Sequence, residues 1–146
     1  MTPKLFIRIA AVLIFIHAFG HTVGHSGWKK ATDPVEHQVI QQMTGHKFPF
    51  MGVNRSLAEY FDGYGYAGSI AMFLISAILF IIAADLSTNT KLARNITLAI
   101  STGFLCWAIN EWIFFFPFAT AITFLAFVSS MYAYYLLSKT TSIKVE

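Results

Sequence analysis

Four apolar stretches, each about as long as a bilayer crossing, constrain the fold of this chain more than any other feature. They run through residues 5–25, 64–84, 96–116 and 118–137. A membrane-spanning helix needs about 20 apolar residues. Only 12% of the 146 residues are charged, against about 25% in a soluble domain. The sequence therefore predicts an all-α, polytopic four-helix bundle that forms a single transmembrane domain over residues 1–146.

The last two stretches are separated by little more than one proline. Between residues 96 and 138 the chain has no Lys, Arg or Asp and a single Glu. This block is too long for one span and just long enough for two. Pro117 cannot donate a backbone hydrogen bond but is well suited to the first position of a helix. We expect a tight helical hairpin at Phe116–Phe118.

The segment between the first two spans, residues 26–63, carries signals of ordered structure. Asp33-Pro34-Val35-Glu36 is typical of a capped helix start, and Gly45 is a stop signal. The apolar residues between them fall on one face, which predicts a short amphipathic helix at the membrane surface. An apolar turn is expected at His46–Gly52. A second capping box, Ser56 with Glu59, places the start of the next helix before its membrane span.

The distribution of basic residues predicts the orientation. Six of them lie in short segments at the two termini and in the loop between the second and third spans, and four lie in the long loop 26–63. Basic residues in short segments favour the cytoplasmic side, so we expect both termini inside. The basic residues form no stripe, which argues against nucleic-acid binding. The single cysteine, Cys106, excludes an intrachain disulfide and a cysteine metal cluster.

Three histidines, His17, His21 and His25, recur every fourth residue in the first span. At about 100° per residue they form one slowly rotating stripe. Gly20 and Gly24 fall beside the stripe, and a Gly-x-x-x-Gly pair lets another helix approach closely. We therefore expect the stripe to face the bundle interior.

Glu111 is the only acidic residue in the predicted spans. A carboxylate inside a membrane is costly and normally faces a partner or a wet cavity. At about 1.5 Å per residue, Glu111 lies level with His17 and His21. This predicts a polar cluster of His17, His21, Glu111 and the adjacent Asn110, with His25 and Asp62 nearer its mouth.

Several kinds of site fit such a cluster. His17, His21 and Glu111 could share zinc or another divalent metal with an open position. Haem is disfavoured because its two axial ligands must approach from opposite faces, whereas these histidines share one helix. A lipid, sterol or quinone headgroup could instead be anchored by hydrogen bonds. The competing interpretation is structural: a histidine pairs with Glu111 only to hold two helices together, and one pair would be enough for that.

Two motifs resemble those of a family of small, uncharacterised bacterial four-span membrane proteins. The first is Gly20-His21-Thr22-Val23-Gly24-His25, and the second runs from Phe50 to Gly65 with the sequence FMGVNRSLAEYFDGYG. The resemblance covers the whole chain in layout. It implies a bundle of the bacterial inner membrane in which both motifs, including Arg55 and Asp62, meet at the outer mouth. It implies no reaction. The span layout is also similar to that of the eukaryotic ergosterol-biosynthesis scaffold protein, which binds other membrane enzymes.

The sequence thus predicts a multi-pass protein, embedded in the lipid bilayer, that binds a small lipid-like ligand or a metal ion in an outward-facing pocket. The alternative is a structural or scaffold protein that contacts other membrane proteins. Catalysis and oligomeric state are left open. The candidate binding residues are His17, His21, His25, Asn110, Glu111, Arg55 and Asp62.

Overall fold

The computed structural model describes residues 2–142, and within them the all-α architecture is confirmed. The elements in chain order are α1 (Pro3–Gly27), α2 (Pro34–Gly45), β1 (Lys47–Phe50), β2 (Val53–Ser56), α3 (Leu57–Ala84), α4 (Thr90–Phe114) and α5 (Pro117–Ser142). By length and composition α1, α3, α4 and α5 can each cross a membrane. The chain is therefore a multi-pass membrane protein.

The helices extend beyond the apolar stretches because polar caps continue them. α4 begins at Thr90, not near residue 96, because the Asn89 side chain accepts a hydrogen bond of 3.0 Å from the Leu92 N–H. The N-cap of α2 is Asp33, whose carboxylate accepts from the Val35 and Glu36 N–H groups, as predicted. α5 begins at Pro117, which confirms the helical hairpin.

The chain divides into two compact units. We call the first the bundle unit; it comprises Met1–His17 and Met72–Glu146. We call the second the loop unit; it comprises Ala18–Ala71. α1 and α3 each contribute residues to both.

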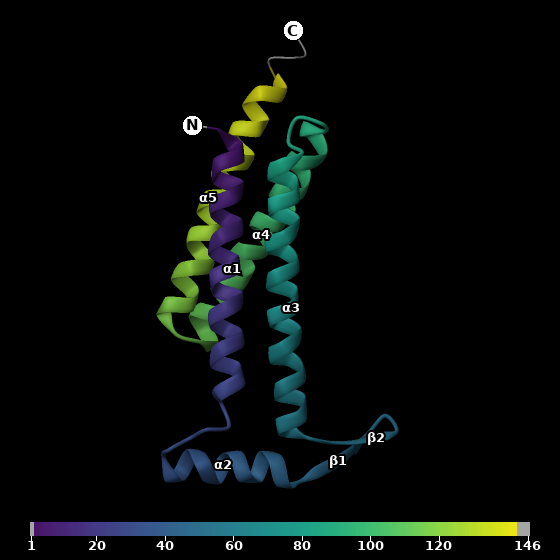
Figure 1. The fold of residues 1–146 in the computed structure, drawn as a ribbon, viewed down its shortest axis with the longest axis vertical. Helices are drawn as coiled ribbons and strands as arrows, with labels where there is room; N and C mark the ends of the chain where they lie inside the picture. The colour runs from purple at the N-terminus through teal and green to yellow at the C-terminus, as the bar shows by residue number, and fades with distance from the viewer. Residues whose placement is uncertain (1, 143–146) are drawn as a thin grey trace. The chain divides into compact units, whose positions relative to one another are not determined.

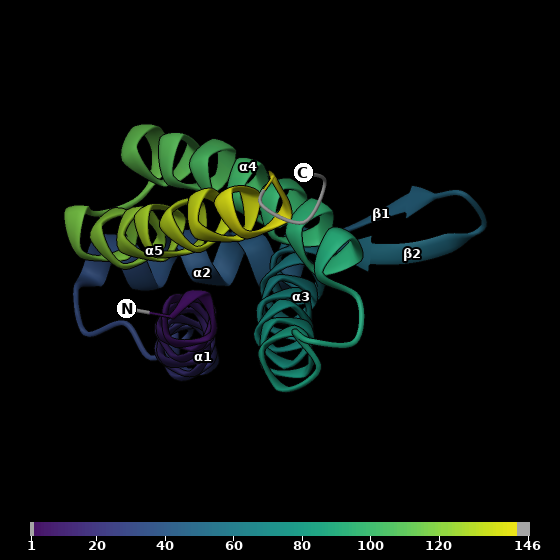
Figure 2. The same cartoon turned by 90° about the horizontal axis from the view of Figure 1, so that it is seen from above.

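In the bundle unit, α4 and α5 run alongside each other in both views (Figures 1 and 2). Most of their buried residues are small or hydroxyl-bearing and recur at spacings of three and four, which lets helices pack closely in a membrane. The Ser101 and Ser130 hydroxyls hydrogen bond at 2.7 Å across this interface. Ser129 donates to the Phe6 carbonyl of α1 at 3.1 Å. Ser76 of α3 donates to the Ala11 carbonyl of α1 at 2.9 Å. Hydrogen bonds from serine hydroxyls therefore join all four helices of this unit.

The outward faces of the long helices carry large apolar side chains. Examples at half exposure or more are Phe19, Ile70, Leu74, Trp112 and Val23. Exposure on this scale suits a hydrocarbon solvent, as the composition predicts.

In the loop unit, a β-hairpin that the sequence analysis missed replaces the expected apolar turn. β1 and β2 pair antiparallel, with Phe50 opposite Val53. The two-residue loop between them has positive φ at Met51 (46°) and at Gly52 (87°). This is the backbone of a type I′ turn, whose twist matches that of the strands. Gly52 at the second position of the loop is typical of a type I′ turn. Met51 at the first position is not, so the turn was not predicted from the sequence.

Candidate functional site

The predicted cluster is present in part, and its residues belong to separate arrangements in the two units. In the bundle unit, His17 Nε2 lies 3.3 Å from Glu111 Oε1, which confirms the predicted pairing of α1 with α4. His17 Nδ1 lies 3.0 Å from the Thr123 hydroxyl of α5. Glu111 is 3% exposed and His17 8%. One imidazole therefore joins three helices in the dry interior of this unit.

The polar atoms of this buried trio are mutually compatible. With its proton on Nε2, the His17 ring donates toward Glu111 and accepts at Nδ1 from the Thr123 hydroxyl. Thr123 was missing from the sequence-based candidates because a threonine in an apolar helix is common. Asn110, which was predicted as a member of the cluster, is exposed on the outward side of α4.

In the loop unit, His21 and His25 pack against the first turns of α3. His21 Nε2 is hydrogen bonded to the Gly65 carbonyl at 3.1 Å. The His25 ring stacks parallel to that of His21, with centroids 6.0 Å apart, and meets Tyr66 edge to face. Thr22 and Ser69 extend the same contact with a hydroxyl bond of 2.9 Å. We call these residues, His21, Thr22, His25, Gly65 and Ser69, the α1–α3 clasp.

The glycine that makes the clasp possible lies on α3. A Cβ at Gly65 would overlap the His25 ring, whereas one at Gly20 or Gly24 would meet no described atom within 4 Å. The predicted Gly20–Gly24 groove is therefore wrong as a packing surface. On the helical wheel, at about 100° per residue, Gly20 points roughly 140° away from His25, whose side faces α3.

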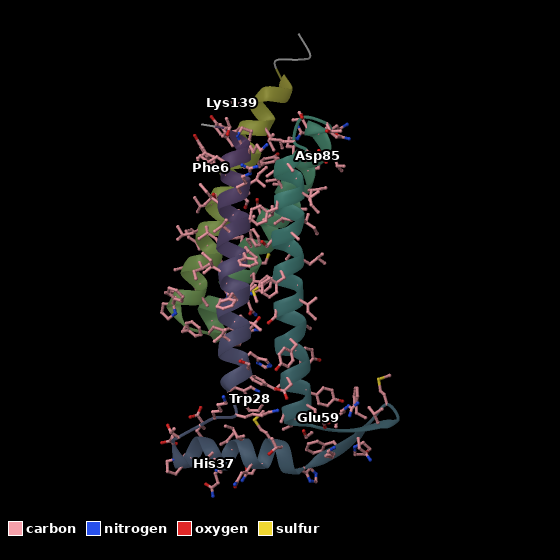
Figure 3. The ribbon with its side chains drawn as sticks, in the orientation of Figure 1. Phe6, Trp28, His37, Glu59, Asp85 and Lys139 are labelled. Carbon is pink, nitrogen blue, oxygen red and sulfur yellow. The ribbon has the colours of Figure 1, made fainter. Side chains whose placement is uncertain are left out.

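Asp62 connects the ends of the two helices in the loop unit. Its Oδ1 accepts a hydrogen bond of 2.8 Å from the Trp28 indole and lies 3.6 Å from His25 Nε2. Its Oδ2 is paired with Lys29. Figure 3 labels Trp28 at the end of α1 and Glu59 at the start of α3, at the same end of these helix segments. The histidine motif and the Phe50–Gly65 motif thus meet within this unit, as the resemblance implied. Trp28 and Lys29 were not predicted as site residues.

Arg55 belongs to the start of α3. Ser56 and Glu59 form the predicted capping box: the Ser56 N–H donates to Glu59 Oε2 at 2.7 Å, and the Glu59 N–H donates to Ser56 Oγ at 3.2 Å. Arg55 Nη1 lies 3.3 Å from Glu59 Oε1, and Lys47 Nζ lies 3.8 Å from the same atom. Glu59 therefore closes the helix start and pairs with two exposed cations.

A shallow, open groove of about 300 Å³ follows one face of α3 from this point. The small residues Gly63 and Ala67 form its hollow, and Tyr64, which is 78% exposed, borders it. The full lining is Arg55, Glu59, Tyr60, Gly63, Tyr64 and Ala67. Arg55 was among the candidate residues, but the groove could not be predicted, because it depends on which face of α3 is left uncovered.

The metal site predicted from His17, His21 and Glu111 is not supported. Among residues 2–142, no three His, Cys, Asp or Glu side chains are grouped so that they could hold a metal ion. The physical reason is local: the Nε2 atom of His21 is hydrogen bonded to the Gly65 carbonyl, and the ring nitrogens of His17 contact the Glu111 carboxyl group and the Thr123 hydroxyl.

Comparison with known proteins gives no further assignment. No protein-family model matches the chain, and neither the curated proteins nor the solved structures that were compared include a match. Function is therefore argued from the geometry alone.

Proposed function

We propose that this protein binds one lipid-like molecule with an acidic headgroup in the α3 groove, in the inner membrane of a bacterium. Both termini are proposed to face the cytoplasm, from the excess of basic residues in the short segments. The groove and the capping box then face outward. The family resemblance remains part of this proposal.

The main support for the proposal is the order of charged, aromatic and apolar groups along the groove. Arg55 lies at one end, tyrosines border the middle, and the small residues Gly63 and Ala67 leave an apolar hollow on a helix that can span a membrane. An acidic amphiphile has the same order of parts, an anionic head followed by an apolar tail. A guanidinium binds phosphate or carboxylate oxygens with two parallel hydrogen bonds.

The present partner of Arg55 does not prevent this role. Its pair with Glu59 is solvent-exposed, with side-chain exposures of 52% and 37%, and exposed pairs contribute about 0–1 kcal/mol. Lys47 lies near the same Glu59 oxygen and can keep it paired when Arg55 turns to a ligand.

A scaffold role is the second candidate, and a specific observation favours it. The rings of His17, His21 and His25 contact groups on other helices, which is what helix packing alone requires. On this account the groove would remain empty or would be covered by another membrane protein.

Native mass spectrometry of the detergent-purified protein, titrated with phosphatidylglycerol or with phosphatidylcholine of the same chains, tests the proposal. We expect one tightly bound phosphatidylglycerol. Arg55→Ala should weaken it about tenfold, because a hydrogen bond to a charged group contributes about 1.5–3 kcal/mol. Lys30→Ala, which removes an exposed charge elsewhere in the loop unit, should leave binding unchanged.

Ala67→Leu fills the hollow of the groove and should abolish the tight binding without lowering thermal stability. Equal binding of both lipids by all variants would overturn the headgroup assignment. Absence of any tightly bound lipid in the unmodified protein would favour the scaffold role.

A further inference from the structure

The β1–β2 hairpin has one apolar face and one polar face. Side chains alternate between the faces along each strand, and directly opposed residues share a face. Phe50 is opposite Val53, and Phe48 is opposite Arg55. These four residues therefore share one face, and the other face is made of Lys47, Pro49, Asn54 and Ser56.

The apolar face is uncovered in the described structure. Phe50 is 56% exposed and Val53 49%, and Met51 at the turn is 89% exposed. A two-stranded ribbon cannot bury such a face by itself and is at best marginally stable in water without a packing partner. The hairpin is therefore built to rest against something else.

Contacts between the hairpin and α3 show in which direction the apolar face of the hairpin points. The rings of Phe50 and Tyr60 meet edge to face, with centroids 6.0 Å apart. Arg55, on the same face, pairs with Glu59 one turn into α3. In the loop unit the hairpin leaves the start of α3 as an arm to one side (Figure 1). Its apolar face thus turns toward the side along which α3 continues.

We propose that this face lies in the headgroup layer of the bilayer around α3, with Phe48, Phe50, Val53 and Met51 at the boundary of the acyl chains. The hairpin is joined to α3, a candidate span, through the capping box of Ser56 and Glu59. α3 begins at Leu57, about 10 Å before the apolar stretch that starts at residue 64, so the hairpin is held at the depth of the headgroups. Aromatic side chains are enriched at that level.

Charge and backbone chemistry favour a lipid surface over a partner protein. Lys47 and Arg55 exceed Glu59 by one positive charge, which suits the phosphates of anionic lipids. A partner that adds a strand needs donors along an exposed edge, and Pro49 has no N–H to offer in β1. This face contacts bulk lipid around the protein, so its placement does not require a lipid molecule bound in the α3 groove.

Spin labels at matched positions test this placement. In a Cys106→Ser background, single cysteines are introduced as Phe50→Cys on the apolar face and as Asn54→Cys on the polar face. Val53→Cys repeats the test on the apolar face in case Phe50→Cys disturbs folding. The labelled proteins are reconstituted into vesicles of phosphatidylcholine with phosphatidylglycerol, and collisions with oxygen and with a water-soluble nickel chelate are measured.

Labels at positions 50 and 53 should collide severalfold more with oxygen, relative to nickel, than the label at position 54. Equal nickel accessibility at 50, 53 and 54 would overturn the proposal. Protection of 50 and 53 from both reagents would also overturn it, because it would mean that protein, either the same chain or a second copy, covers the face. None of these results depends on tight lipid binding measured by mass spectrometry, so this proposal and the groove can fail independently.

Discussion

The histidines of α1 meet two different environments. In the bundle unit, His17 contacts a carboxyl group that is 3% exposed and a hydroxyl that is 1% exposed. In the loop unit, His21 bonds a backbone carbonyl, and His25 lies near Asp62, whose side chain is 27% exposed. Loss of a partner in the first case leaves a polar group in a dry interior, where water cannot replace it. In the second case water can reach the Asp62 carboxylate, although His25 itself is as buried as His17, at 8% exposure.

The largest effect is expected in the bundle unit. His17→Leu should lower the free energy of unfolding by about 3 kcal/mol, since breaking a buried pair costs about 3–5 kcal/mol. Within residues 2–142, Glu111 Oε2 already lacks a hydrogen bond. The substitution would in addition remove the His17 ring from Glu111 Oε1. Unfolding in mixed micelles measures the change.

The double variant His17→Leu with Glu111→Leu separates pairing from packing. Replacement of both partners by apolar residues is often nearly neutral, so most of the lost stability should return. A double variant as unstable as the sum of the two single variants would show that no coupling energy joins the two side chains.

In the loop unit, Gly65→Ala should lower the free energy of unfolding by about 1–3 kcal/mol, the usual cost of overpacking. The reason is the overlap of the new Cβ with the His25 ring. Gly24→Ala is the matched control: its Cβ meets nothing described within 4 Å, so helix propensity should stabilise it by up to about 1 kcal/mol. Equal effects of the two substitutions would contradict the assignment of the packed glycine to α3.

The smallest effect is expected at Asp62, which lies beside the clasp and is partly exposed to water. Asp62→Asn keeps an oxygen for the Trp28 indole but removes the charge that pairs with Lys29. It should cost no more than about 1 kcal/mol, and the difference from the unmodified protein should shrink at high salt. Chemical unfolding at low and high ionic strength checks this, and a salt-independent loss would mean that the charge is not the cause.

Much of the fold could be predicted from the sequence because its signals are local. Hydropathy and length predicted the four spans, and Pro117 predicted the helical hairpin of α4 and α5. The capping residues Asp33 and Ser56 predicted the starts of two helices. The β-hairpin was missed because methionine rarely occupies the first position of a type I′ turn, where φ is positive.

The candidate site could be predicted only where depth and charge determine it. The pairing of Glu111 with His17 follows from the cost of an isolated carboxyl in a membrane. The face of α1 that meets α3 does not follow from local sequence, so the packing groove predicted at Gly20 and Gly24 was wrong. The groove beside Arg55 could not be predicted from the sequence for the same reason, because only tertiary packing determines which face of α3 stays uncovered.

The histidines of α1 hold helices together, whereas the proposed ligand site is the α3 groove. The most direct test measures bound phosphatidylglycerol by native mass spectrometry and Tm for His21→Ala and Ala67→Leu side by side. We expect His21→Ala to lower Tm and keep the lipid, and Ala67→Leu to keep Tm and lose the lipid. Loss of the lipid in His21→Ala at unchanged Tm, with the lipid retained in Ala67→Leu, would contradict this expectation.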